Sequence, residues 1–175
     1  MEEHVILVDT SDQEIGTMGK MEAHEKGELH RAFSVFLFNE EGDTLLQQRA
    51  EGKYHSPGLW TNSCCSHPRQ NESVEDAARR RLGEELGIQL SDVSDLARQF
   101  HFIYRADFDN GLTEHELDHV LTAKFDGVVD LNEEEVQDVQ WMSIDDITSD
   151  MKANPEDYTA WFKIIFDQYL KHLPR

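Results

Sequence analysis

The sequence lacks a set of spaced cysteines, a long apolar run and a basic leader. Only two of its 175 residues are cysteines. These two, Cys64 and Cys65, are adjacent, so they do not indicate a disulfide framework. No apolar run approaches the roughly 18 residues that a membrane-spanning helix needs, so we expect no insertion into a membrane. The first residues, MEEHVILVD, lack the basic segment that begins a secretion signal, and we therefore expect a cytoplasmic protein.

Positive charge is also scarce. Lysine and arginine together number 16 against 36 aspartates and glutamates, which gives a formal net charge of -20. A surface of this charge repels nucleic acid and anionic membranes, so neither is expected as a partner. Composition leaves two explanations of the acidic excess open. One is solubility, and the other is adaptation to high salt, where screening removes the self-repulsion of the chain.

The pattern of apolar residues predicts one mixed α/β domain over residues 1–175. No linker, repeat or low-complexity tract divides the chain, and its length fits a single domain with a sizeable core. We expect this core between about residues 30 and 150. The predicted strands cover residues 4–9, 14–18, 32–38, 44–49, 61–65, 96–108, 113–125 and 136–142. The other predicted segments are a polar loop over residues 20–30, a solvated acidic loop over residues 131–135, a short helix after Ser143 and an amphipathic terminal helix over residues 156–172.

The stretch over residues 61–88 combines a short strand, a loop and a helix. Ser73 is predicted to cap the helix, because the Ser-Val-Glu-Asp sequence that begins there has the spacing of a capping box. Gly87 is predicted to end it, because glycine adopts the left-handed conformation that closes a helix at little cost. Arg81 and Glu85 are four residues apart and therefore share a face. Considered on its own, the charged helix is most simply interpreted as one whose exposed face carries ion pairs.

The spacing along this stretch resembles the Nudix box, Gly-x5-Glu-x7-Arg-Glu-apolar-x-Glu-Glu-x-Gly-apolar. The matching positions are Ser66, Glu72, Arg80, Arg81, Leu82, Glu84, Glu85, Gly87 and Ile88. Two of them depart from the pattern. Ser66 replaces the glycine, and Arg81 replaces a glutamate with which Nudix hydrolases hold metal. A box that keeps other carboxylates and gains an arginine suits a diphosphate but argues against hydrolysis.

The residues before the helix carry a longer and more specific match. The sequence PGLWTNSCCSHP, residues 57–68, resembles the PGxWTNSxCxHP signature of the type 1 isopentenyl-diphosphate isomerases. These are Nudix-fold enzymes that move a double bond. The similarity runs from about Glu3 to the predicted terminal helix, and it implies a Nudix α/β/α sandwich with a central mixed sheet. We expect the chain to act as a monomer on a small molecule.

Three acidic residues, Glu114, Glu116 and Asp118, alternate along a predicted strand, so they share one face at a spacing of about 7 Å. Considered alone, they are most simply an exposed acidic face, because like charges are costly there unless the face is wet or holds a cation. The resemblance implies instead a metal site of His24, His30, His67, Glu114 and Glu116. Such a mixture of imidazole and carboxylate suits Mn²⁺, Zn²⁺, Fe²⁺ or a tolerant Mg²⁺ site. No role is assigned to the remaining histidines, which are His4, His55, His101, His115, His119 and His172.

The resemblance also implies a diphosphate site. It puts Glu85 near a Mg²⁺ ion that accompanies the diphosphate. It gives the contacts with the phosphate oxygens to four basic residues, Lys20, Arg49, Lys53 and Arg81. Arginine binds phosphate through a fork of N–H groups and lysine as a mobile point charge. Four cations from separate segments would also offset the repulsion between the acidic chain and an anionic substrate.

The reaction that the resemblance implies interconverts isopentenyl and dimethylallyl diphosphate through a tertiary carbocation. Cys65 and Glu116 form the implied acid–base pair, and the order in which they act is left open. Tyr104 would hydrogen-bond the carboxyl group, and Trp161 would cover the cation with its ring. Because neighbours on a strand face opposite sides, Cys64 is predicted to be a small core residue.

Two other functions remain open. The first is a Nudix hydrolase of a nucleoside diphosphate derivative, although Arg81 and the TNSCCSHP segment argue against it. The second is a metal- or diphosphate-binding module without catalysis. Phosphate release would identify the hydrolase, and binding without exchange of substrate protons would identify the module.

Overall fold

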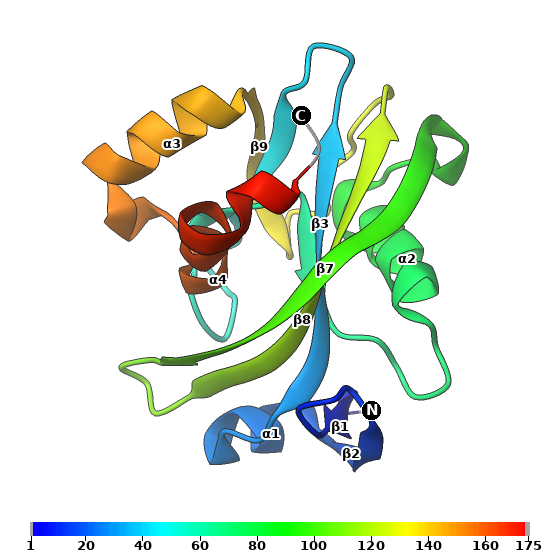
Figure 1. Cartoon of the computed structure of the whole chain (residues 1–175), viewed down its shortest axis with the longest axis vertical. Coiled ribbons are helices and arrows are strands. Elements are labelled where there is room, and N and C mark those ends of the chain that lie inside the picture. Colours follow the sequence, from blue (N-terminus) through cyan, green and yellow to red (C-terminus); the bar gives the residue numbers. More distant parts are fainter. Residues whose placement is uncertain (1, 174–175) are drawn as a thin grey trace.

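A nine-stranded mixed sheet organises the chain, and the computed structural model describes residues 2–173. Its strands are β1 (His4–Val8), β2 (Glu14–Gly19), β3 (His30–Phe38), β4 (Thr44–Arg49), β5 (Trp60–Thr61), β6 (Cys64–Ser66), β7 (Val93–Asp107), β8 (Thr113–Phe125) and β9 (Val136–Met142). The central strand β3 runs parallel to β8 and antiparallel to β1, β4 and β6. Strands β7 and β8 form the long hairpin that crosses the molecule in Figure 1.

Helices cover both faces of this sheet. Helix α2 (Val74–Leu86) lies on one side, and α3 (Ile144–Ala153) and α4 (Ala160–Ile164) lie on the other (Figure 1). The Ser73 hydroxyl accepts a hydrogen bond from the backbone N–H of Asp76, and Gly87 closes α2 in the left-handed conformation, as predicted. The predicted mixed α/β sandwich is therefore confirmed. Within residues 2–173, no helix combines the length and the apolar character needed to cross a membrane.

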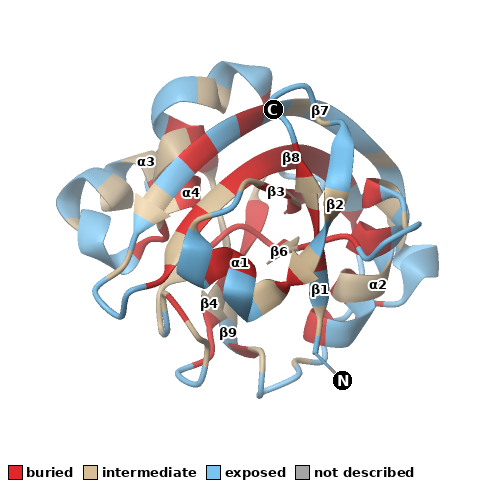
Figure 2. Ribbon diagram, turned by 90° about the horizontal axis from the view of Figure 1, so that it is seen from below, coloured by how far each residue is buried: buried red, intermediate tan, exposed pale blue. Residues whose placement is uncertain are grey.

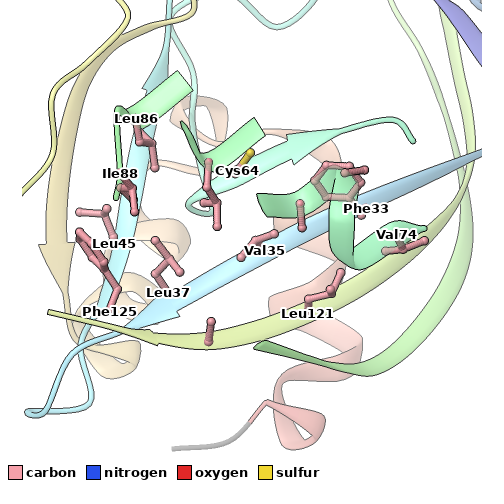
Figure 3. Close-up of a cluster of buried hydrophobic side chains, with 14 of the residues drawn as sticks. Phe33, Val35, Leu37, Leu45, Cys64, Val74, Leu86, Ile88, Leu121 and Phe125 are labelled. Atoms are coloured by element: carbon pink, nitrogen blue, oxygen red, sulfur yellow. The ribbon is translucent and has the colours of Figure 1, made fainter. Parts of the chain in front are cut away.

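Alternation along β3 divides the core into two parts. Phe33, Val35 and Leu37 face α2 and pack with Cys64, as the close-up in Figure 3 shows. Phe36 and Phe38 belong to the second part, which packs against α3 and α4. Buried segments follow the strands at the centre of Figure 2, whereas the outer surfaces of α2 and α3 are exposed. Burying a large apolar side chain stabilises the fold by about 1.5–3 kcal/mol, so both layers hold the central strands in place.

The prediction of a polar loop over residues 20–30 is wrong. Residues 20–26 form helix α1 (Lys20–Lys26), which Gly27 ends in the left-handed conformation. Lysine, methionine, glutamate and alanine favour a helix, and the high polarity of the segment concealed this preference. The helix carries His24 into a buried position, and His30 begins β3.

The prediction of a single terminal helix over residues 156–172 is also wrong, because the helix begins later and changes its width. The backbone of Tyr158 pairs with Trp60, and the N–H of Thr159 donates to the carbonyl of Trp60 at 3.0 Å. Because residues 158 and 159 are held in this extended pairing, α4 begins only at Ala160. The chain then continues in a wider helical turn (Ile165–Tyr169) and a tighter one (Leu170–His172).

The strand predicted over residues 61–65 is two short strands, because two buried side chains take the place of regular pairing. The Asn62 amide donates to the carbonyls of Val35 and Cys64, at 3.0 Å each. The Ser63 hydroxyl donates to the carbonyl of Leu45 at 2.7 Å. This irregular turn fixes the direction of β6, whose residues reach the site described next.

Candidate active site

A small cavity lies where β3, β6, β8 and α4 meet the loop that follows β4. Its volume is about 30 Å³, which exceeds the roughly 10–15 Å³ that a single water molecule requires. Its walls combine a thiol, two carboxylates, two imidazoles, a guanidinium and an indole. The lining residues are Phe33, Ser34, Arg49, Tyr54, His55, Cys65, Ser66, His67, Glu114, Glu116 and Trp161.

Histidines from three segments surround the carboxylates of β8. His24 comes from α1, His30 from the start of β3 and His67 from the residue after β6. The donor atoms of these rings and of Glu116 all lie within 4.8 Å of one another. Glu114 and Glu116 are only 3% and 5% exposed. The structure therefore brings all five predicted metal ligands together, and it excludes the exposed acidic face.

The donor atoms of this cluster are oriented as a metal site requires. Nδ1 of His24 donates to the carbonyl of Lys20 at 2.6 Å, and Nδ1 of His30 donates to the carbonyl of Glu28 at 2.9 Å. When such a ring is neutral, Nδ1 carries its hydrogen and the lone pair of Nε2 is available to a metal ion. Metal–nitrogen bonds of about 2.1 Å hold opposite ligands about 4 Å apart, which matches the spacing of the cluster. The residues present therefore fit a divalent metal ion.

The charge states of the clustered side chains agree with a metal site. Burial and the neighbouring Glu114 raise the pKa of Glu116, but hydrogen bonds from His30 and His67 outweigh them and bring this pKa to about 2. Burial lowers the pKa of His67 to about 4, against the opposing effect of Glu116. At pH 7 Glu116 is thus an anion and His67 a neutral imidazole, which are the forms that bind metal.

The Cys65 thiol lies at the other side of the cavity. Its Sγ donates to Asn62 Oδ1 at 3.0 Å and accepts a hydrogen bond from Nε1 of Trp161 at 3.0 Å. Burial and the nearby Asp118 raise the pKa of Cys65 to about 12. The group therefore keeps its proton at neutral pH, as an acid must.

Tyr104 reaches both carboxylates. Its hydroxyl contacts Glu114 and donates to Oε1 of Glu116 at 2.5 Å. Asp118 extends the same face of β8, and its Oδ2 accepts a hydrogen bond from the hydroxyl of Ser34 at 2.7 Å. Burial and the charge of Glu116 raise the pKa of Asp118 well above its usual range.

Arg49 is a buried cation with no counter-ion. The residue is 6% exposed, and it forms no ion pair among residues 2–173. Its Nη2 donates to the carbonyl of His55 at 3.1 Å, and its Nε has no partner in the same part of the chain. An unpaired buried charge is costly, so this guanidinium is suited to an anionic ligand.

The other three predicted phosphate-binding cations are paired with carboxylates. Lys20 lies 3.4 Å from Glu3, and Lys53 contacts Glu135. Glu135 also lies 3.4 Å from Arg81. Lys20 further stands over the ring of cavity-lining Tyr54, 4.5 Å from its centre. None of the three cations lines the cavity, and Lys20 approaches it through Tyr54.

Glu85 occupies a separate, buried position on α2. Its Oε1 accepts a hydrogen bond from Arg81 at 2.9 Å, and its Oε2 accepts from Cys64 Sγ at 3.0 Å and from Gln47 at 3.3 Å. Among the described residues, the histidine-rich groups of potential metal ligands do not include Glu85. The structure therefore separates Glu85 from the histidine cluster, as a second cation near the diphosphate would require.

Several polar groups of the site were missed by sequence reasoning. His55 and Tyr54 come from an irregular loop, Ser34 from an apolar strand and Asn62 from a turn. None of them belongs to a periodic pattern or to an expected ligand set. Glu135 lies in the acidic loop predicted to be solvated, and only its ion pairs distinguish it from its neighbours. The one available signal was the position of His55, two residues after Lys53.

The NUDIX domain model matches residues 28–162. The isopentenyl-diphosphate Delta-isomerase of Aliivibrio fischeri is 50% identical over 177 residues, covering 99% of this chain and 98% of that protein. The corresponding isomerase of Pectobacterium atrosepticum is 51% identical, with 93% and 88% covered. The chain belongs to the isopentenyl-diphosphate Delta-isomerase family of Nudix proteins. This membership confirms the resemblance and favours the isomerase over the hydrolase.

Solved structures support the fold independently. A Deinococcus radiodurans protein superposes with a TM-score of 0.76 at 18% identity, covering 95% of this chain and 99% of that one. The M. Smegmatis Nudix hydrolase RenU gives a TM-score of 0.59 at 15% identity, with 97% and 98% covered. At these identities the likeness extends to the Nudix fold alone.

Proposed function

We propose that the protein interconverts isopentenyl and dimethylallyl diphosphate. One observation carries the proposal. A single small cavity holds a protonated thiol, an ionised carboxylate, an indole ring and a buried guanidinium without a counter-ion. The first three groups are suited to a hydrocarbon that gains and loses a proton, and the fourth is suited to an anion.

The acid and the base are Cys65 and Glu116. In one direction, the thiol gives its proton to the terminal carbon of the alkene, whose electron pair forms the new C–H bond and leaves a cation at C3. Glu116 then takes a proton from C2, and the released electron pair forms the C2–C3 double bond. In the opposite direction the two roles are exchanged. Tyr104 supports the carboxylate through its hydrogen bond to Oε1.

Trp161 would stabilise the cation between these two steps. Its ring lines the cavity, and its N–H holds the sulfur of Cys65. An aromatic face next to a cation contributes about 2 kcal/mol when water is excluded. The enclosure also protects the cation from capture by water.

The histidine cluster would hold a divalent ion, for which Mn²⁺, Mg²⁺ and Zn²⁺ are the candidates. When bound, such an ion would supply the positive charge that keeps the buried carboxylates ionised. Its ligands would be His24, His30, His67, Glu114 and Glu116. A separate Mg²⁺ near Glu85 would accompany the diphosphate, whose oxygens would contact Lys20, Arg49, Lys53 and Arg81.

Substrate binding requires movement. A cavity of about 30 Å³ is too small for a five-carbon chain, so side chains that line it must move when the hydrocarbon enters. The diphosphate must also displace Glu3 and Glu135 from the lysines. We keep the expectation of a monomer in the cytoplasm, and sedimentation of the purified protein tests the first part.

A substrate panel tests the proposed function. The protein is incubated with isopentenyl diphosphate, dinucleotide polyphosphates and nucleoside triphosphates, and both dimethylallyl diphosphate and free phosphate are measured. We expect the isomer and no phosphate. Phosphate release at an enzymatic rate, or binding of isopentenyl diphosphate without any isomer, would overturn the proposal.

A further inference from the structure

Two buried histidines line the described cavity, His55 and His67. Only His67 belongs to the predicted set of metal ligands. His55 lies in the loop between β4 and β5 and is 3% exposed. Its Nε2 lies 2.7 Å from Oε1 of Glu114. This contact is shorter than the 3.4 Å between Oε1 of Glu114 and Nε2 of His24. The nearest imidazole to this carboxylate is therefore one that sequence reasoning left without a role.

The hydrogen bonds of His55 define what the ring can do. Its Nδ1 lies 3.1 Å from the hydroxyl of Ser56, which can donate to it. A neutral ring then carries its hydrogen on Nε2 and donates it to Glu114. His24 has the opposite arrangement, because its Nδ1 donates to a backbone carbonyl and its Nε2 lone pair faces the cluster. His55 is thus a donor to a ligand, whereas His24 has the orientation of a ligand.

The position of His55 agrees with this distinction. The group of four donor atoms within 4.8 Å of one another contains His24, His30, His67 and Glu116 but not His55. His55 groups only with His24 and Glu114. It therefore meets the cluster only through His24 and Glu114, where a hydrogen bond can orient the carboxylate toward the other ligands.

The ring of His55 is itself held firmly. It stacks on Phe108 with 4.8 Å between centres and 5° between planes, and it meets Trp161 edge-on at 5.7 Å. Its backbone carbonyl accepts a hydrogen bond from Arg49 at 3.1 Å. One residue therefore contacts a metal ligand, the indole over the cavity and the unpaired guanidinium.

We propose that His55 is a positioning residue that holds Glu114 in the orientation needed to bind the metal ion. The inference rests on the metal site of the proposed function. Without the hydrogen bond from His55, Oε1 of Glu114 would keep only the long contact with His24, and the hydroxyl of Tyr104 alone would hold the other oxygen. Partners of this kind typically contribute 10–100-fold to metal affinity.

Mn²⁺ binding to the purified, metal-free protein tests the proposal without any measurement of activity. Affinity is measured from the electron paramagnetic resonance of free Mn²⁺, and the rise in Tm on adding Mn²⁺ is recorded as a second readout. We expect H55F, which keeps the stacking ring, to weaken Mn²⁺ binding by about 10–100-fold. We expect H55Q, whose amide can still donate to Glu114, to lie closer to the wild type than H55F does.

His119 offers a matched control. It is 4% exposed, and its Nε2 bonds Oδ2 of Asp12 at 2.9 Å, on the opposite face of β8. H119F should therefore lower stability without changing the affinity for Mn²⁺. If H55F does not fold, H55N takes its place, because its shorter side chain cannot reach Glu114.

The possible failures are distinguishable. The role of His55 would be overturned if H55F bound Mn²⁺ within twofold of the wild type, or if H55F and H119F lost equal affinity for Mn²⁺. Either result would leave the proposed metal site unaffected. A wild-type protein that does not bind Mn²⁺ would overturn the metal site and the role of His55 together.

Discussion

Cys64 and Cys65 are neighbours in the chain, yet their thiols face different layers of the molecule. Cys64 lies in the core beneath α2 and donates a hydrogen bond to Glu85 at 3.0 Å. Cys65 lines the cavity, between Asn62 and Trp161. Burial raises the pKa of both thiols above the usual range. The two cysteines therefore differ in what they can reach, and their acidity does not separate them.

The same division extends to most of the site, although Arg49, which is suited to an anion, lines the cavity on the side of Cys65. The side of Cys65 gathers the histidine cluster, Tyr104 and Trp161, which suit the movement of a proton. The side of Cys64 gathers Glu85 and the charged residues of α2, which suit a diphosphate and its cation. Substitutions on the first side should reduce turnover, and those on the second side should change binding or stability.

The largest contrast is expected between the two cysteines. Cys65→Ala removes the acid and should lower kcat by at least about a hundredfold, while inorganic pyrophosphate should still bind. Cys64→Ala should keep most of the activity and lower the free energy of unfolding by about 1–2 kcal/mol, through the lost bond to Glu85. Turnover assays and urea unfolding check both. An inactive Cys64 variant with an active Cys65 variant would reverse the assignment of the two faces.

Trp161 should show the next largest effect. Trp161→Phe keeps an aromatic face but loses the hydrogen bond to Cys65, so partial activity is expected. Trp161→Ala also loses the face, and a cation–π contribution of about 2 kcal/mol corresponds to a further factor of about 30 in kcat. Both rates are compared at a temperature where circular dichroism shows the variants folded. Equal kcat values in the two variants would show that the aromatic ring of residue 161 does not stabilise the cation.

A smaller effect is expected on the α2 side, at Glu135. Its carboxylate pairs with Lys53 and Arg81, and the substrate diphosphate would have to replace it. Glu135→Gln should lower KM for isopentenyl diphosphate by about twofold to fivefold, because a partly exposed ion pair contributes 0.2–1 kcal/mol. Glu134→Gln, in the same loop, is the control. A rise in KM for Glu135→Gln alone would mean that this carboxylate assists binding.

The smallest effect concerns Glu72, which precedes α2. Hydrogen bonds from Arg80 lower the pKa of Glu72 below 4.5, against the raising effect of burial. A lowered pKa in the folded state stabilises the fold above the unfolded pKa, and this contribution is lost as pH falls through the folded value. The Tm of the wild type should therefore exceed that of Glu72→Gln at pH 7, and the difference should shrink below pH 4.5. A difference independent of pH would show that the charge of Glu72 has no part in it.

Periodic features of the sequence predicted most of this architecture. The alternation of Glu114, Glu116 and Asp118 placed them on one face of β8, and the Ser73 and Gly87 signals bounded α2 correctly. The opposite faces of Cys64 and Cys65 followed from strand geometry alone, even though the strand proved to be two short ones. These features could be predicted because the period of a strand or helix determines which side chains share a face.

Features set by tertiary contacts could not be predicted. His24 was expected in a loop because the polarity of its segment outweighed its helix propensity. His55 and Glu135 acquire their partners only when irregular loops fold onto β8 and α2. The break before α4 depends on the pairing of Tyr158 with Trp60, which are far apart in the sequence. In each case the deciding contact lies outside the local pattern.

Exchange of substrate hydrogens with heavy water distinguishes proton transfer by Cys65 and Glu116 from binding alone. Isopentenyl diphosphate is incubated with the protein in heavy water, and deuterium is located by nuclear magnetic resonance. We expect deuterium in the C4-derived methyl group and at C2 for the wild type, and at neither position for Cys65→Ala or after thorough chelation of metal. Substrate that binds to the wild type and returns without deuterium would contradict this expectation.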